Sequence, residues 1–224
     1  AENGFNCGDS GKVKNFGKLQ LTAGKAAMDS IQKVVSKELN LNQKVVSLGG
    51  DHSITFPIIQ AYSQSYSDLN ILHIDAHPDL YDNFENNPYS HASPLARIME
   101  KGLVNRLVQV GIRTLNDHQK EQVKRFGVEV IEMNNFDSSL LLQFDGPVYI
   151  SIDIDALDPA FAPGISHLEP GGLSTRDVIN IIYQLNGNVV GGDIVEYNPD
   201  RDINGMTAVV GAKLLKELLG KILK

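Results

Sequence analysis

Three short segments of the sequence place carboxylates and imidazoles directly after apolar stretches. The segments are Gly49–His52 (GGDH), Asp75–Asp79 (DAHPD) and Asp153–Asp155 (DID). Alternate residues of an extended chain point to the same side. The first, third and fifth residues of DAHPD can therefore converge, and the two aspartates of DID can do the same. Together the segments offer carboxylate and imidazole groups for one shared site.

Four carboxylates gathered in one site would repel each other and take up protons unless a positive charge balanced them. The three segments contain no Lys or Arg, so we expect divalent cations there. Oxygen and imidazole ligands without thiolate suit Mn²⁺, Fe²⁺ or Co²⁺, and bridging carboxylates suit a pair of ions roughly 3.5–4 Å apart. We expect Asp75 and Asp153 to bridge the ions. The remaining ligands would divide into His52 with Asp79 on one ion, and His77 with Asp155 on the other.

Each of these segments alone has a plainer explanation. A single D-x-H-x-D can be a solvated strand end, and GGDH can be a turn followed by a helix cap. All three in one chain, each after an apolar stretch, favour the metal site. His73 has the same parity as Asp75 but lies deeper in its apolar stretch, so we interpret it as a core or supporting residue rather than a ligand.

The rest of the chain alternates between short apolar stretches and amphipathic ones. Near-continuous apolar stretches are typical of strands buried on both faces, and the alternation predicts a three-layer α/β/α fold with a mostly parallel sheet. The expected strands are Lys44–Leu48, Asn70–Ile74, Leu107–Ile112, Val128–Ile131, Val148–Ile154 and Asn188–Val195. The expected helices are Lys18–Leu39, Ser53–Tyr66, His91–Lys101, Asn116–Arg125, Ser174–Leu185 and Met206–Leu223.

Two long irregular segments, Pro78–Ser90 and Ala156–Leu173, each follow an expected strand that ends in acidic residues. In an open parallel sheet, ligands bind beyond the carboxyl ends of the strands. Long loops of this kind in compact domains are often functional. We therefore expect both segments to border the site.

Composition excludes several classes of protein. The 224 residues carry 20 Lys+Arg and 27 Asp+Glu, a formal charge of −7, and contain one cysteine. An acidic chain without a basic tract argues against a nucleic-acid partner, and a single cysteine excludes an intrachain disulfide. No apolar stretch reaches the ~20 residues of a membrane span. We expect one domain over residues 1–224 and a cytoplasmic location, with an organelle as the alternative if an N-terminal segment is missing.

The motifs resemble the signatures of the ureohydrolases, the family of arginases, agmatinases and formiminoglutamases. The matching segments are Gly49–Ser53 (GGDHS), Asp75–Asp79 and Ser151–Pro159 (SIDIDALDP). Tyr89–Ser93 (YSHAS), Phe161–Gly172 and Val195–Asp202 look most like the plant-type arginases. The first 40 residues match poorly, although Asn6-Cys7-Gly8-Asp9 faintly resembles a D-x-G-D strand.

The resemblance implies a centre of two Mn²⁺ ions, an arginase-like fold and hydrolysis of a guanidinium group to urea and an amine. It also implies a homo-oligomer, a trimer or hexamer. The family's additional N-terminal strand–helix unit is absent, so we expect the chain to be incomplete or reduced there. The implied metal ligands are all present, and they are His52, Asp75, His77, Asp79, Asp153 and Asp155.

Three side chains are candidates for catalysis. Glu196 follows the last expected strand and can pair with a guanidinium, since carboxylate and guanidinium match geometrically. Asp79 can pass a proton from the attacking water to the departing amine. His91, just beyond the Asn-rich loop, can carry protons to solvent. Glu196 and His91 also have structural alternatives, as a loop carboxylate and a surface histidine at a helix start.

The substrate is less well defined by the sequence. We expect uncharged donors such as Asn83 and Ser90 to bind the far end of the substrate. We also expect His167 to contact the substrate, since it lies where most agmatinases and animal-type arginases have a T-G-T-P-like stretch. Acidic neighbours could instead attract an amine. L-Arginine, giving L-ornithine and urea, is our preferred substrate, and agmatine, giving putrescine, is the alternative. A two-metal phosphoesterase and an inactive regulatory relative are the competing functions.

Overall fold

Six strands of the described chain form one parallel sheet in the order β1-β6-β5-β2-β3-β4. The computed structural model describes residues 1–8 and 11–224. The strands are β1 (Val46–Leu48), β2 (Asn70–Ile74), β3 (Arg106–Ile112), β4 (Glu129–Glu132), β5 (Gln143–Asp153) and β6 (Asn186–Val195). Every residue of β2 is buried, as expected for a strand covered on both faces.

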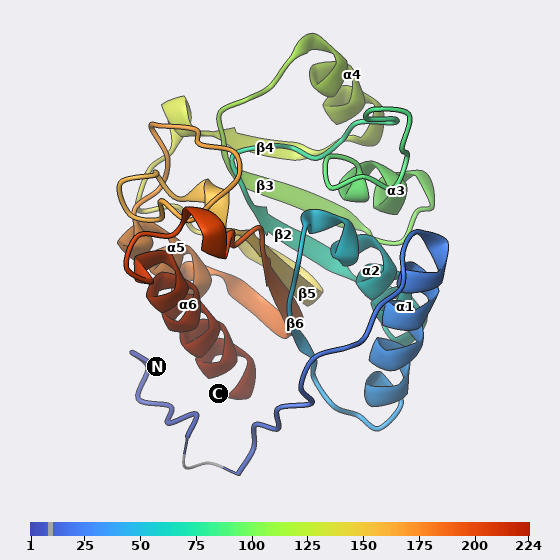
Figure 1. Cartoon of the computed structure of the whole chain (residues 1–224), viewed down its shortest axis with the longest axis vertical. Coiled ribbons are helices and arrows are strands. Elements are labelled where there is room, and N and C mark those ends of the chain that lie inside the picture. The colour runs from blue at the N-terminus through green and yellow to red at the C-terminus, as the bar shows by residue number, and fades with distance from the viewer. Residues whose placement is uncertain (9–10) are drawn as a thin grey trace.

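Helices cover both faces of this sheet (Figure 1). On one face, α5 (Thr175–Gln184) and α6 (Met206–Leu223) pack against the apolar side chains of β5 and β6. The other face is covered by α1 (Lys25–Leu39), α2 (Thr55–Ser65), α3 (Pro94–Glu100) and α4 (Asp117–Phe126). Short 3₁₀ turns, η1 (His52–Ile54), η2 (Met133–Asn135), η3 (Ile154–Ala156) and η4 (Pro199–Arg201), follow strands. The three-layer α/β/α prediction is therefore confirmed.

Helix ends follow local chemistry that the sequence shows only in part. Ser174 caps α5 through a capping box with Asp177, and Pro94 fixes the start of α3. The first helix is the exception, since α1 begins at Lys25 and not at Lys18. Gly24 precedes it with a φ of 59°, a conformation that keeps the preceding residues out of the helix. Residues 6–8 form no strand, and Asp9, in the faint D-x-G-D match, lies outside the described residues.

Gly192 of β6 has no room for a side chain. An added Cβ would lie 2.5 Å from the Ile150 carbonyl oxygen and 2.8 Å from Leu218 Cδ2. We expect Gly192→Ala to lower the free energy of unfolding by about 1–3 kcal/mol, as overpacked cores do. Gly211→Ala in α6 is the matched control, because its Cβ would meet only Ile154 Cδ1 at 3.4 Å and helix propensity favours alanine by about 1 kcal/mol. Urea denaturation followed by circular dichroism measures both, and equal effects would contradict the close-approach argument.

Candidate metal centre and substrate cavity

The four strands β1, β6, β5 and β2 are neighbours in the sheet, and chemically active side chains follow the carboxyl end of each. His52 follows β1 in η1, Asp75 follows β2, Asp153 ends β5, and Glu196 follows β6. Local hydrogen bonds shape these strand ends. The Asp75 carboxylate accepts from the His77 N–H at 2.6 Å, and the Asp153 carboxylate accepts from the Asp155 N–H at 2.7 Å. The fold thus brings the three sequence segments together at the carboxyl ends of the strands.

The imidazoles and carboxylates form two groups that share Asp75. Nδ1 of His52 lies 3.2 Å from Asp75 Oδ2, 3.0 Å from Asp79 Oδ2 and 3.2 Å from Asp153 Oδ2. Nδ1 of His77 lies 3.1 Å from Asp155 Oδ2 and 3.4 Å from Asp75 Oδ1. The two oxygens of Asp75 therefore face different groups, the arrangement that a bridging carboxylate requires.

Burial and crowded charge shift the pKa values of these side chains. Burial, followed by the charges of Asp155 and Asp75, raises the pKa of Asp153 well above its usual range. Burial and the Asp75 charge also raise the pKa of Asp155. Burial by itself lowers the pKa of His77, but hydrogen bonds with Asp155 and Asp75 outweigh it and raise the value to about 12. Positive charge near these carboxylates comes from the histidines and from Arg113, which interacts with Asp155 and Asp75, yet the pKa values of Asp153 and Asp155 stay raised.

Unpartnered atoms within the cluster fit a divalent cation. Nδ1 of His52 and Oδ2 of Asp75 are buried and have no hydrogen-bond partner, which is costly unless another group satisfies them. Two sets of side chains place one possible ligand atom each within 4.8 Å of the others. The sets are His52, His73, Asp75 and Asp79, and Asp75, His77 and Asp155. Carboxylate and imidazole donors are those that Mn²⁺ and similar ions prefer.

A buried polar cluster behind His52 orients its ring. Ser151 Oγ donates to Asp193 Oδ1 at 2.7 Å and lies 2.9 Å from His52 Nε2. Thr55 and Tyr149 both donate to Asp193 Oδ2 at 2.8 Å. Because the Ser151 proton goes to Asp193, Ser151 must accept from His52, and we assign the ring proton to Nε2. Nδ1 of His52 is then the nitrogen that faces the carboxylates. Burial by itself lowers the pKa of His52, but the contacts with Asp153, Asp75 and Asp79 outweigh it and raise the pKa well above its usual range, so a metal ion would take the place of a proton on Nδ1.

Two of the predicted catalytic residues have left-handed backbone conformations. Asp79 has a φ of 50° and Glu196 a φ of 65°, which is uncommon for residues other than glycine. Glu196 Oε1 also accepts the His52 N–H at 2.8 Å, and its own N–H donates to the Gly50 carbonyl oxygen at 3.2 Å. Burial raises the pKa of Glu196 despite that hydrogen bond. Strained conformations of this kind concentrate at functional sites.

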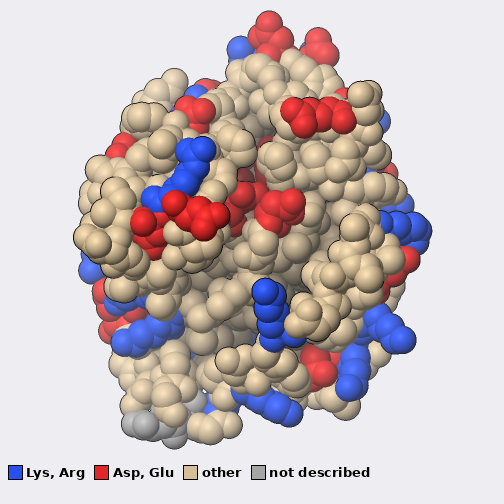
Figure 2. All heavy atoms as spheres, viewed as in Figure 1, with Lys and Arg blue, Asp and Glu red and all other residues tan. Residues whose placement is uncertain are grey.

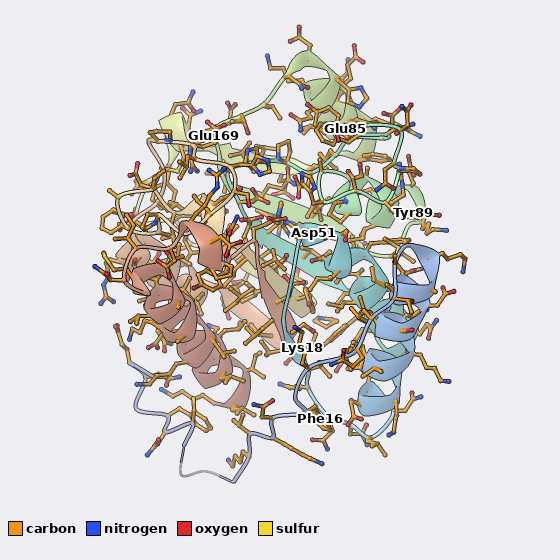
Figure 3. All side chains as sticks on the ribbon, viewed as in Figure 1. Phe16, Lys18, Asp51, Glu85, Tyr89 and Glu169 are labelled. Atoms are coloured by element: carbon orange, nitrogen blue, oxygen red, sulfur yellow. The ribbon has the colours of Figure 1, made fainter. Side chains whose placement is uncertain are left out.

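A cavity of about 420 Å³ opens above the metal-ligand cluster. Its lining contains His77, Asp79, Asp153, Asp155 and Glu196, and no Lys or Arg among the described residues. Figure 2 shows this face of the molecule hollowed near its centre, with acidic side chains around the hollow. In Figure 3, Asp51 and Glu85 lie around this hollow, and Glu169 lies across it from them. The cavity therefore suits a small cationic molecule.

The cavity lining includes only some of the predicted substrate residues. His91 and His167 both line it and stack with ring centroids 5.5 Å apart. Asn83 is exposed and does not line it, while Ser90 is buried with its hydroxyl 3.3 Å from that of Ser93. Seven other lining residues were not singled out from the sequence, and they are Tyr81, Phe84, Ala92, Thr114, Leu115, Asn116 and Gln119. The polar residues just after β3 could have been found by the same strand-end rule that located the metal segments.

Comparisons with known proteins agree with this geometry. The model of the Arginase family matches residues 2–220. The chain is 53% identical over 210 residues to arginase 1, mitochondrial, of Arabidopsis thaliana, covering 88% of this chain and 61% of that protein. It is 35% identical over 218 residues to the agmatinase of Bacillus anthracis, covering 93% of this chain and 75% of that protein.

A solved structure gives the same result. The arginase from Medicago truncatula superposes with a TM-score of 0.84 at 50% identity, covering 90% of this chain and 66% of that one. The chain thus spans about 55–61% of the length of the curated plant arginases that it matches first. Sequence, fold and site point to one conclusion, that the chain belongs to the arginase family.

Proposed function

We propose that this protein hydrolyses the guanidinium group of L-arginine to urea and L-ornithine. The observation that carries the proposal is the pair of histidine–carboxylate groups sharing Asp75 at the base of a cavity that Glu196 lines. The cavity lining argues against the phosphoesterase alternative, since a phosphate substrate needs basic groups and the described lining has no Lys or Arg. An inactive relative would be expected to lack ligands, and all six are present.

We propose two Mn²⁺ ions per chain as the cofactor. The ligands would be His52, Asp79 and Asp153 on one side and His77 and Asp155 on the other, with Asp75 shared. Asp153 is also predicted from the sequence to be a bridge, and its Oδ2 lies 3.2 Å from His52 Nδ1. When bound, such a pair of ions supplies activated water near neutral pH.

The side chains around the cluster have separate tasks in this proposal. Glu196 pairs with the substrate guanidinium and holds its carbon over the metal ligands, in a geometry that carboxylate–guanidinium pairs favour. Asp79 lines the cavity beside the cluster and can pass a proton to the departing amine. His91, half-buried in the same lining, exchanges protons with solvent.

The assay that tests the function is urea release from L-arginine, agmatine and 4-guanidinobutyrate, with and without added Mn²⁺. We expect Mn²⁺-dependent release with arginine as the preferred substrate, because the plant relatives that are 53% and 57% identical to this chain over the aligned residues are named arginases. The agmatinase relative is more distant at 35% identity. Preference for agmatine would overturn the substrate assignment, and no release from any guanidino compound would overturn the activity.

His91→Asn tests the proton carrier. We expect bound metal and KM to stay near their wild-type values and kcat to fall by about 10²–10⁴-fold, the range for general acid–base groups. Added imidazole should restore part of the lost rate, because a diffusible base can replace a carrier but not a ligand. A large rise in KM without imidazole rescue would instead make His91 a substrate-binding residue.

We propose that residues 1–224 form one catalytic domain and that the protein assembles as a homo-oligomer, a trimer or hexamer. Light scattering after size-exclusion chromatography tests the assembly. The names of the plant relatives include mitochondrial and chloroplastic proteins, which favours the organellar location over the cytoplasmic one. In the described part of the chain, no helix has the length and apolar character needed to cross a membrane.

A further inference from the structure

His73 and His52 lie next to each other beneath the carboxylates, and distance alone does not separate their roles. Their ring centroids are 5.0 Å apart and both side chains are fully buried. Asp75 Oδ2 is 3.2 Å from His52 Nδ1 and 2.8 Å from His73 Nε2. Both histidines therefore belong to one set of possible metal ligands. The partners on the far side of each ring distinguish them.

Gln109 determines which nitrogen of His73 carries the proton. It lies opposite His73 in the β2–β3 ladder and is fully buried. Its Nε2 is 2.7 Å from the Pro78 carbonyl oxygen and 3.0 Å from His73 Nδ1. Only the NH₂ end of the amide can face a carbonyl oxygen at 2.7 Å, since an amide oxygen there would be a second acceptor. The other N–H then faces Nδ1, which must accept, so the His73 proton is on Nε2.

The proton on Nε2 explains the short contact with Asp75. Because Gln109 occupies Nδ1 of His73, the nitrogen 2.8 Å from Asp75 Oδ2 is the protonated one, and an N–H facing a carboxylate oxygen is attractive. In the described part of the chain, neither His73 Nε2 nor Asp75 Oδ2 has a hydrogen-bond partner elsewhere, so this contact is the one that can satisfy both atoms. Through this N–H, His73 limits where Asp75 Oδ2 can lie.

His52 has its proton on the same nitrogen but faces the cluster the other way. Ser151, held by Asp193, accepts from His52 Nε2 and leaves Nδ1 as the nitrogen that a cation among the carboxylates can bind. His73 instead presents its protonated nitrogen to the carboxylates, and Gln109 occupies its bare one. A bare ring nitrogen can bind a metal and a protonated one cannot.

We propose that His73 is a positioning residue for Asp75 and not a metal ligand, and that Gln109 sets this role. The inference rests on the proposed function, because it takes Asp75 as a ligand. Mutation of a partner that holds a metal ligand in place typically lowers metal affinity or activity by about 10–100-fold. We expect loss of the His73–Gln109 pair to lower the Mn²⁺ affinity by a factor in that range.

Mn²⁺ titration of three variants separates a positioning residue from a ligand. We expect His73→Leu to bind two Mn²⁺ at saturation with about 10–100-fold weaker affinity. His73→Gln should recover most of the loss, because its amide can donate to Asp75 from the position of Nε2. His52→Leu is the ligand control and should lose one ion even at saturation. One ion on saturated His73→Leu, or an unchanged affinity, would overturn the proposal.

The protonation of His73 can be measured without metal. In the metal-free chain labelled with ¹⁵N-histidine, NMR should show the His73 ring protonated on Nε2 and bare on Nδ1. Gln109→Leu should lose this preference, with thermal unfolding as the control for folding. A proton on Nδ1 of His73 in the wild type would overturn the inference. A wild-type chain that binds no Mn²⁺ would contradict the proposed function, while the NMR result would still decide the role of His73.

Discussion

Replacing Asp75 with Asn is expected to abolish Mn²⁺-dependent urea release and to remove bound metal. The two carboxylate oxygens of Asp75 face the two histidine groups, 3.2 Å from His52 Nδ1 and 3.4 Å from His77 Nδ1. Asparagine keeps the shape but loses the charge and one of the two ligand oxygens. The loss should exceed the roughly 10–100-fold effect of removing a partner that only supports a ligand.

Metal analysis after dialysis, together with the urea assay, measures this effect. Asp82→Asn is the matched control, because Asp82 is an exposed aspartate of the neighbouring loop whose carboxylate is 3.3 Å from His118. It should retain its metal and its rate. Two bound ions and a near-normal rate in Asp75→Asn would show that Asp75 is not the shared ligand.

Replacing Glu196 with Gln should leave the metal in place and lower kcat/KM by about 30-fold or more. The substitution removes the charge that would pair with the guanidinium. Removing one partner of a buried charge pair weakens binding by about 2–5 kcal/mol. The Gln side chain can still accept the His52 N–H that Glu196 Oε1 accepts at 2.8 Å, so the strand ends should keep their places.

Glu85→Gln is the control for the charge of Glu196, since Glu85 is an exposed carboxylate near the hollow (Figure 3). With arginine as substrate, it should change kcat/KM little. Metal content and kcat/KM are measured on both variants. Loss of metal in Glu196→Gln would make Glu196 a ligand, and an unchanged kcat/KM would exclude it from substrate binding.

The elements that position the site could be read from the sequence because they depend on local patterns. The buried strand NILHI (Asn70–Ile74) and the helix expected over Ser174–Leu185 both follow from the alternation of apolar and amphipathic stretches. The site segments follow from the rule that ligands gather beyond the strand ends of a parallel sheet. Their convergence needs only the strand order, which places β1, β6, β5 and β2 together.

The conformation of the loop that borders the cavity could not be predicted, because contacts with residues distant in the sequence fix it. Arg97, buried in α3, donates to the carbonyl oxygens of Asp82 and Pro88 at 2.6 and 2.9 Å. These bonds help to decide which loop side chains face the cavity, and the loop itself has no periodic pattern from which to read that choice. The sequence predicts a core or supporting role for His73, but not the contact that we propose sets this role, since that contact is made by Gln109 in the adjacent strand.

The pairing of β1 with β6 sets when the metal centre can form during synthesis. In the described sheet β1 is an edge strand whose single neighbour is β6, with Val46 opposite Gly192. His52 therefore emerges from the ribosome long before the strand that anchors it. At roughly 5–20 residues per second, the delay is on the order of ten seconds. Until then β1 has no place in the sheet, so the nascent chain should acquire its metal only after β6 has been made.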